Sequence, residues 1–171
     1  KEMIAIAQRD ERMWSALYQQ RPAPDTGNFF KREWLRYYDS LPANVRVYGA
    51  SDYAVTDKGG DYTVHGVFGV DADDNIYVTD WWRGQTESLA WVEQLLLMIK
   101  SHKPVTWFEE AGQINKSMGP LISKRQQETQ AWCTRQQITY GKQNKEMRAQ
   151  SIRGRMQQGK VYFPKASAWC A

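Results

Sequence analysis

The sequence predicts an α/β fold in which helices flank a mixed β-sheet. Three strand-like runs with short connections follow one another before residue 83, which is typical of an antiparallel meander. From residue 86 onward, amphipathic helical patterns alternate with further strands. The resulting order, β-β-β-α-β-α-β-α-β, predicts a sheet with both antiparallel and parallel pairs. With 171 residues, 42% of them hydrophobic, the chain can bury a core of ordinary size.

The first 43 residues are expected to precede the sheet domain. Apolar positions predict a helix over residues 1–19, and two prolines and a glycine make residues 21–27 a linker. Residues 30–38 have the pattern of a short amphipathic helix that ends before Pro42. The sheet domain is therefore expected to cover residues 44–171.

The meander is expected over three runs. Residues 45–53 (VRVYGASDY) form a strand that ends in an acid, and residues 61–70 (DYTVHGVFGV) alternate β-branched and small side chains. A polar turn separates the second run from the third, residues 76–82 (IYVTDWW). Short connections of this kind join antiparallel neighbours.

The second half of the chain alternates between helices and strands. A broad apolar stripe predicts a helix between residue 86 and Pro104 that packs on the sheet. This stripe consists of Leu89, Trp91, Val92, Leu95, Leu96, Met98 and Ile99. The elements expected after it are a strand at 105–110, a helix carrying Ile114, Met118, Leu121 and Ile122, a strand at 131–139, a helix at about 144–158 and a strand at 161–163.

Charge is distributed unevenly along the chain. The net charge is +4, but residues 111–171 hold eleven basic and two acidic residues, or +9, whereas residues 1–110 carry −5. This pattern fits a metal site beside a polyanion-binding surface, and it also fits a solvated basic face. The residues expected to contact a DNA backbone are Lys142, Lys145, Arg148, Arg153 and Arg155.

Several classes of protein are excluded by what the sequence lacks. Two isolated cysteines, Cys133 and Cys170, form no disulfide framework and indicate a reducing compartment. With two histidines and no paired cysteines, the sequence does not predict a Cys/His zinc site, and His65 is expected to be packed or hydrogen-bonded within its strand. The chain has no apolar run of transmembrane length and no phosphate-binding loop of the GxxxxGK[ST] type. Its eight tryptophans are expected in the core.

Carboxylates at strand ends are the candidate catalytic groups. Asp52 ends the first strand, and Glu109 and Glu110 end the fourth. Carboxylates brought together require a cation between them, and a pair of Mg²⁺ or Mn²⁺ ions would activate water for phosphodiester cleavage. Glu109 and Glu110 point to opposite faces, and parity alone does not select one. Asp61 is a candidate auxiliary ligand; alternatively, all these acids are structural or solvated.

Several motifs, in order, resemble the nuclease domain of the large terminase subunit of tailed bacteriophages. They are YGASDYAVTDKGGDYTV at 48–64, DWWRG at 80–84, WFEEAG at 107–112, KEMRAQSIRGR at 145–155 and GKVYFP at 159–164. The stretches YQQRPAP at 18–24 and FFKREW at 29–34 resemble the segment that joins the terminase ATPase domain to its nuclease. The resemblance covers nearly the whole chain.

The resemblance implies a ribonuclease H-like fold and a metal-dependent endonuclease that cuts concatemeric viral DNA. By position, Asp52 matches the first catalytic acid, Glu109 matches the second better than Glu110, and Asp61 matches an acid that often accompanies the first. The implied metals are Mg²⁺ or Mn²⁺, two ions in the complete protein. The implied partners are double-stranded DNA, the small terminase subunit and the procapsid portal, without a membrane, in the cytoplasm of the bacterial host.

The family pattern also has a third catalytic acid, which follows the last short strand. No acid occurs after Glu146, so this acid is expected beyond Ala171, and the chain is expected to be a truncated nuclease whose ATPase domain precedes Lys1. A missing final helix would expose apolar sheet surface and favour self-association. The alternatives are a transposase-like or junction-resolvase-like nuclease on the same fold, and a non-catalytic DNA-binding fragment.

Overall fold

The computed structural model describes residues 29–54, 60–139, 141, 145–167 and 169. The helix expected at 1–19, the linker at 21–27, Lys142 and Cys170 lie outside these residues. The chain divides into two compact units, Lys1–Trp34 and Leu35–Ala171. In the described part of the first unit, a 3₁₀ turn, η1 (Arg32–Trp34), brings the Lys31 ammonium to 5.8 Å from the centroid of the Trp34 ring.

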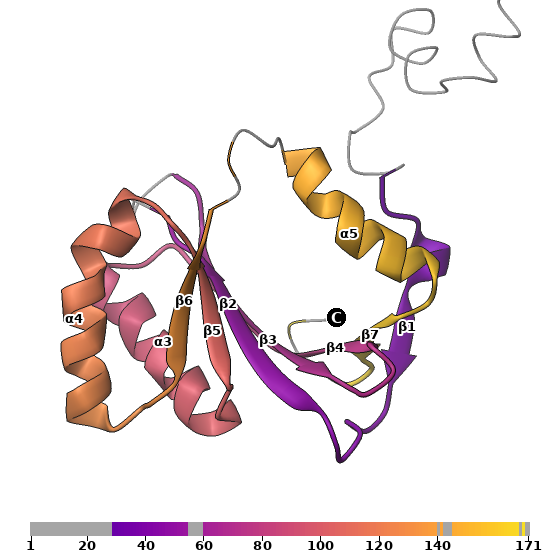
Figure 1. Cartoon of the computed structure of the whole chain (residues 1–171), viewed down its shortest axis with the longest axis horizontal. Coiled ribbons are helices and arrows are strands. Elements are labelled where there is room, and N and C mark those ends of the chain that lie inside the picture. Colours follow the sequence, from indigo (N-terminus) through magenta and orange to yellow (C-terminus); the bar gives the residue numbers. More distant parts are fainter. Residues whose placement is uncertain (1–28, 55–59, 140, 142–144, 168, 170–171) are drawn as a thin grey trace, which may run out of the picture. The chain divides into compact units, whose positions relative to one another are not determined.

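The second unit is built on a mixed sheet, which has seven strands within the described residues (Figure 1). The strands are β1 (Arg36–Tyr38), β2 (Arg46–Asp52), β3 (Thr63–Val70), β4 (Ile76–Gly84), β5 (Thr106–Glu110), β6 (Thr134–Ile138) and β7 (Val161–Pro164), in the spatial order β1-β7-β4-β3-β2-β5-β6. β2, β3 and β4 form the antiparallel meander, and β5 and β6 add in parallel beside β2. The predicted fold class, a mixed sheet with an antiparallel meander flanked by helices, is confirmed.

The prediction of a helix over residues 30–38 is wrong. After η1, the chain extends into β1, which pairs in parallel with β7, so that Arg36 lies opposite Tyr162. The Tyr38 hydroxyl donates a hydrogen bond to the Val78 carbonyl at 2.9 Å, and its ring packs edge-on against Tyr77. These long-range contacts outweigh the local helical pattern. The compact unit that contains the sheet therefore begins at Leu35, nine residues ahead of the predicted start at 44.

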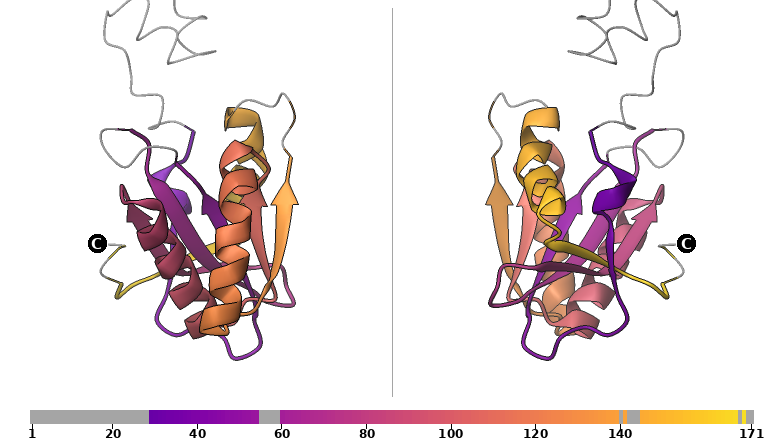
Figure 2. Two further views of the ribbon diagram at one scale, coloured as in Figure 1. Left: turned by 90° about the vertical axis from the view of Figure 1, so that its left-hand side faces the viewer. Right: turned by 90° about the vertical axis from the view of Figure 1, so that its right-hand side faces the viewer.

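Helices lie on both faces of the sheet (Figures 1 and 2). α3 (Ser88–His102) and α4 (Gln113–Thr129) cover one face, and α5 (Lys145–Gln157) lies over the other. The predicted stop of α5 is confirmed, because Gly159 has φ +70° and the Lys160 amide donates to the Arg155 carbonyl at 2.9 Å. Within the described residues, no helix has both the length and the apolarity to cross a membrane.

The hydrophobic core lies between the sheet and the face of α3 that the sequence predicted. Its buried residues are Val67, Trp91, Val92, Leu95, Leu96, Met98, Ile99, Trp107, Ile122 and Ala131. Leu89, also expected in this stripe, is the second residue of α3 and is 53% exposed. The face of the sheet toward α5 has no comparable fully buried cluster among the described residues. The site described next lies on that face.

Candidate active site

The register of two parallel strands brings Asp52 and Glu110 to the same side of the sheet. β2 and β5 pair in parallel, with Ser51 opposite Glu109. Residues opposite each other in neighbouring strands share a face, and side chains alternate along each strand. Asp52 and Glu110, one residue further along, therefore face α5, whereas Ser51 and Glu109 face α3 and α4.

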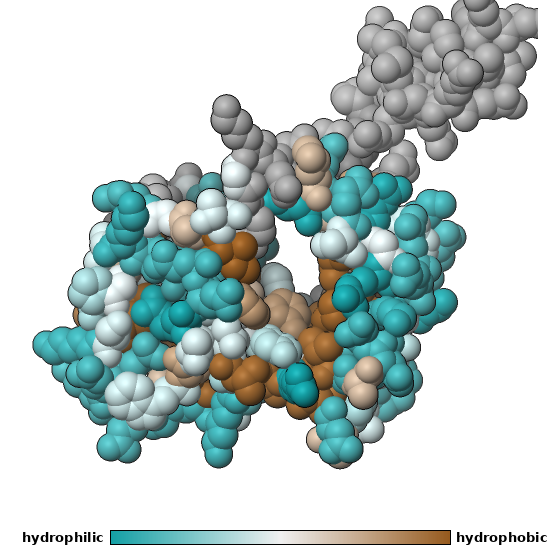
Figure 3. All heavy atoms as spheres, in the orientation of Figure 1, coloured by the Kyte–Doolittle hydropathy of each residue, from teal (hydrophilic) through white to brown (hydrophobic). Residues whose placement is uncertain are grey.

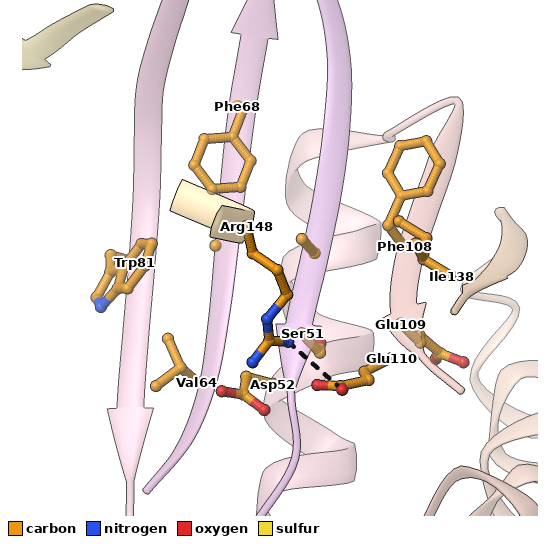
Figure 4. Close-up of a pocket in the computed structure, with 12 residues that line it drawn as sticks. Ser51, Asp52, Val64, Phe68, Trp81, Phe108, Glu109, Glu110, Ile138 and Arg148 are labelled. Atoms are coloured by element: carbon orange, nitrogen blue, oxygen red, sulfur yellow. Dashed lines mark hydrogen bonds and ion pairs between the residues drawn. The ribbon is translucent and has the colours of Figure 1, made fainter. Parts of the chain in front are cut away.

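Asp52 and Glu110 lie in an open pocket of about 370 Å³ (Figure 4). Their carboxyl groups point into the same part of the pocket. Two carboxylates so placed destabilise each other's charged form unless a cation lies nearby. The pocket is also lined by Ala50, Ser51, Val64, Gly66, Phe68, Trp81, Phe108, Glu109, Ile138 and Arg148.

Arg148 from α5 supplies a positive charge at this point. Its Nη1 atom lies 3.5 Å from Glu110 Oε1, and Figure 4 shows the guanidinium reaching between the carboxyl groups of Asp52 and Glu110. The side chains of Arg148 and Glu110 are 27% and 49% exposed, so water screens the ion pair. Such a pair contributes about 0–1 kcal/mol. It is weak enough to be exchanged for contacts with a metal ion or a phosphate.

Glu109 lies on the opposite face and is saturated with hydrogen bonds. It is only 2% exposed. Oε1 accepts from the Tyr53 hydroxyl and from Arg135 Nε, both at 2.7 Å, and Oε2 accepts from Asn115 Nδ2 at 2.7 Å and Arg135 Nη2 at 2.8 Å. A carboxylate has about four acceptor positions, and all are used here. The structure thus brings Asp52 together with Glu110, in contrast to the expected pairing of Asp52 with Glu109.

The buried Glu109 carboxylate pairs with Arg135, whose side chain is 14% exposed, and this pair joins β5 to β6. Burial lowers the pKa of Arg135, but the hydrogen bonds and negative charge of Glu109 outweigh burial and raise it above its ordinary value. Burial, followed by the charge of Glu109, raises the pKa of the Tyr53 hydroxyl far above its usual value, so that Tyr53 remains a hydrogen-bond donor. Tyr53 and Arg135, the two titratable partners of the Glu109 carboxylate, therefore keep their protons across the physiological range.

A second buried network lies behind Asp52. Trp107 Nε1 donates to Ser51 Oγ at 2.8 Å, and Ser51 Oγ lies 2.7 Å from His65 Nδ1. His65 Nε2 lies 3.0 Å from the Trp91 carbonyl, which only accepts, so Nε2 carries the proton and Nδ1 accepts from Ser51. Burial lowers the pKa of His65 to about 4. The expectation of a hydrogen-bonded His65 within the strand is confirmed.

The remaining predicted ligand, Asp61, is exposed and precedes the first residue of β3. It is not among the residues that line the pocket. No group of three or more histidines, cysteines or acids within the described residues is placed to hold a metal ion. The donor set on this face therefore consists of two carboxylates, Asp52 and Glu110. Mg²⁺ is commonly held by one or two carboxylates together with water and substrate phosphates, so this pair fits a single such ion.

The predicted basic residues have different surroundings. Arg148 reaches the carboxylates, whereas Arg155 Nη1 donates to the Asp74 carbonyl at 2.8 Å in the β3–β4 turn. Arg153 is half-buried, and Lys145 begins α5. Arg148 is thus the predicted DNA-contacting residue that the structure brings to the pocket.

The sequence analysis missed the residues that support the site from behind. Arg135, Asn115 and Tyr53 surround Glu109, but an Arg in a strand and an Asn in a helix give no sign of a shared buried partner. The exposed Trp81 was expected in the core. The register of the two strands carries the information that identifies Glu110. When residues 48–52 are aligned with residues 106–110, Asp52 and Glu110 lie opposite each other and on the same face of the sheet.

Comparisons with known proteins give structural neighbours at low identity. No profile of a protein family matches the chain, and no curated protein sequence is significantly similar to it. The HK97 bacteriophage large terminase matches with a TM-score of 0.46 and 11% identity over 95% of this chain and 40% of its own. The fowlpox virus Holliday junction resolvase matches with a TM-score of 0.44 and 12% identity over 68% of this chain and 78% of its own. The same resolvase in complex with junction DNA matches with a TM-score of 0.41 and 9% identity over 66% and 74%.

The buried pair predicts a specific pattern of stability. Glu109→Gln leaves the Arg135 charge buried without its counter-charge, so we expect the free energy of unfolding to fall by about 3–5 kcal/mol. The double variant Glu109→Gln/Arg135→Gln removes both charges and is expected to recover most of this loss. Urea unfolding of the unmodified chain, the single variants Glu109→Gln and Arg135→Gln, and the double variant measures the coupling. A loss in the double variant equal to the sum of the losses in the two single variants would contradict the pairing.

His65 predicts a loss of stability in weak acid. Its pKa is lowered to about 4 in the folded protein, whereas an unfolded histidine binds a proton near pH 6.5. Between these values the unfolded state binds more protons, so stability falls as the pH drops from about 6.5 to 4, by up to about 3 kcal/mol. Chemical unfolding at several pH values measures this slope. His65→Gln is the control, and an unchanged slope in that variant would assign the effect to other groups.

Proposed function

We propose that this chain is a metal-dependent DNA endonuclease domain that hydrolyses phosphodiester bonds at Asp52 and Glu110. The observation that carries the proposal is the convergence of two carboxylates from adjacent parallel strand ends, with Arg148 between them, in an open pocket. Glu110 takes the place that the sequence analysis gave to Glu109. The basic last third of the chain supports a polyanionic substrate.

The two carboxylates would hold a Mg²⁺ or Mn²⁺ ion, since these hard cations prefer oxygen ligands. When bound, such an ion activates water and offsets the negative charge that develops on a phosphate under attack. Asp61 is exposed and does not line the pocket, and we propose it as an auxiliary ligand on the strength of the sequence motif alone. A second ion would need a further ligand beyond the two carboxylates that share this face.

The chain's own side chains have separate tasks in this proposal. Asp52 and Glu110 would hold the cation, whose positive charge would offset the repulsion between the two carboxylates. Arg148 would exchange its weak contact with Glu110 for the substrate phosphate, because a guanidinium can donate two parallel hydrogen bonds to two phosphate oxygens. Glu109 and Arg135 join β5 to β6 on the opposite face of the sheet and contact neither the cation nor the phosphate in this proposal.

Within this activity, we propose the role of a phage DNA-packaging terminase, which cuts concatemeric viral DNA in the host cytoplasm. The ordered sequence motifs from 48–64 to 159–164 support it. Its proposed partners are double-stranded DNA, the small terminase subunit and the procapsid portal. A strong preference for four-way junctions over linear duplex would instead favour a resolvase-like role.

Nicking of supercoiled plasmid in Mn²⁺ tests the proposed active site. Asp52→Asn and Glu110→Gln each remove a cation ligand, and we expect nicking to fall by about 100-fold or more. The double variant Glu109→Gln/Arg135→Gln keeps both ligands and is expected to nick within about tenfold of the unmodified chain. Circular dichroism confirms that each variant is folded, and EDTA provides the metal-free control.

Two results would contradict the assignment. If Glu110→Gln nicks DNA fully and Glu109→Gln/Arg135→Gln does not, Glu109 rather than Glu110 would be the second ligand. Absence of nicking by the unmodified, folded chain with both Mg²⁺ and Mn²⁺, despite salt-sensitive DNA binding, would favour a non-catalytic DNA-binding role.

A further inference from the structure

We propose that the pocket beside Asp52 and Glu110 binds an unpaired nucleobase, so that the substrate is DNA with a single-stranded, frayed or flipped nucleotide next to the scissile phosphate. This inference rests on the proposed function, and it names the form of DNA that the site takes. It starts from the composition of the pocket wall. The lining residues other than Ser51, Asp52, Glu109, Glu110 and Arg148 are apolar, and they include the aromatic Phe68, Trp81 and Phe108.

These aromatic rings come from three strands and are open to the pocket. Trp81 is 39% exposed, although a tryptophan is usually well covered in a folded domain. Its ring meets Phe68 edge-on at 6.4 Å between centroids, and Phe68 and Phe108 are half-buried. Figure 4 shows Trp81 and Phe68 on one side of Arg148 and Phe108 on the other. A phosphate and a cation need none of these rings.

Gly66 leaves space at the bottom of the pocket between the rings of Phe68 and Trp81. A Cβ atom at this position would lie 2.8 Å from Phe68 Cζ and 2.9 Å from Trp81 Cζ3, closer than normal packing allows. Gly66 itself lines the pocket. The absence of a side chain there lets both ring edges approach the backbone of β3 and leaves the space above it open.

The pocket continues into a larger apolar hollow between the sheet and α5. This hollow has a volume of about 750 Å³ and shares Phe68, Trp81 and Phe108 with the pocket. Figure 3 shows hydrophobic residues gathered around a hollow on this side of the molecule. The volumes of the pocket and of the hollow both fall within the range of about 300–1,000 Å³ found for small-ligand sites. A planar base has room to enter from the carboxylate end.

Charge and ring chemistry together select a nucleotide as the occupant. Arg148 lies at the carboxylate end, where the phosphate of the proposed reaction would lie, and the aromatic rings adjoin it. Every nucleobase has a π-face that stacks on aromatic side chains, and such stacking tolerates any sequence. In a paired duplex both faces of each base are covered, so a base reaches these rings only after it leaves the stack.

Fluorescence of 2-aminopurine tests this inference without relying on cleavage. The probe is a short single-stranded DNA oligonucleotide with one 2-aminopurine, mixed with the complete chain in EDTA so that no hydrolysis occurs. We expect binding to quench its fluorescence. Trp81→Leu should remove the quenching and weaken binding about 5- to 150-fold, the effect of losing one stacked base. Trp132→Leu is the matched control, because Trp132 is 64% exposed but lies outside the pocket.

A second measurement does not depend on how the variants fold. An oligonucleotide with an abasic site in place of 2-aminopurine should bind the unmodified chain more weakly by a similar factor. Binding that is unchanged both by the abasic site and by Trp81→Leu would overturn the inference. The inference would also be overturned if the unmodified chain formed a dimer that failed to bind the probe while Trp81→Leu was a monomer. That result would show that a second copy of the chain occupies the hollow.

Failure of this inference and failure of the proposed function give different results. If Asp52→Asn and Glu110→Gln abolish nicking while Trp81→Leu binds the probe normally, the nuclease assignment stands and the base site is wrong. If the probe is quenched through Trp81 but no metal supports nicking, the base site stands and the chain binds unpaired DNA without cutting it.

Discussion

The parallel pairing of β2 with β5 is the constraint on which the rest of the site depends. Because Ser51 lies opposite Glu109, the next pair, Asp52 and Glu110, is sent to the other face of the sheet. A slip of β5 by one residue relative to β2 would turn every side chain of β5 to the other face of the sheet. Glu110 would then point into the core, Glu109 would point toward α5, and Asp52 and Glu110 would no longer share a face. The register is therefore as important to the proposed chemistry as the identity of the acids.

The two neighbouring glutamates show how one dipeptide can serve two purposes. Glu109 is enclosed by Tyr53, Asn115 and Arg135, whereas Glu110 is half-exposed and forms a weak, solvent-screened ion pair with Arg148. A buried ion pair adds little net stability compared with an apolar pair of similar size, but breaking it is costly. We infer that the Glu109–Arg135 pair joins the ends of β5 and β6 on the face opposite Glu110, whereas the backbone pairing of β5 with β2 and β6 sets the position of Glu110.

The two faces of the sheet differ in the same way. The face toward α3 and α4 is closed by a continuous apolar core with polar groups that are paired internally, such as Ser51 with His65. The face toward α5 retains an open pocket and an apolar hollow. Rigid packing on one face thus supports an accessible site on the other, which is the arrangement that a positioned pair of cation ligands requires.

Much of the fold could be predicted because the local patterns agree with the final structure. The alternation in β3 and the apolar stripe of α3 each report which face is buried, and both were found in the predicted places. β1 could not be predicted, since its three residues are fixed by pairing with β7, more than 120 positions away. The choice between Glu109 and Glu110 depended on register, and the exposure of Trp81 depended on how α5 lies over the sheet; neither is a property of a local segment.

Binding of Mn²⁺, followed by electron paramagnetic resonance, tests the central claim most directly because it needs neither DNA nor turnover. The account predicts that the folded chain binds Mn²⁺, that Asp52→Asn and Glu110→Gln each abolish this binding, and that Glu109→Gln/Arg135→Gln preserves it. Binding that survives Glu110→Gln but disappears in the double variant would contradict the account, because it would place the cation on the opposite face of the sheet.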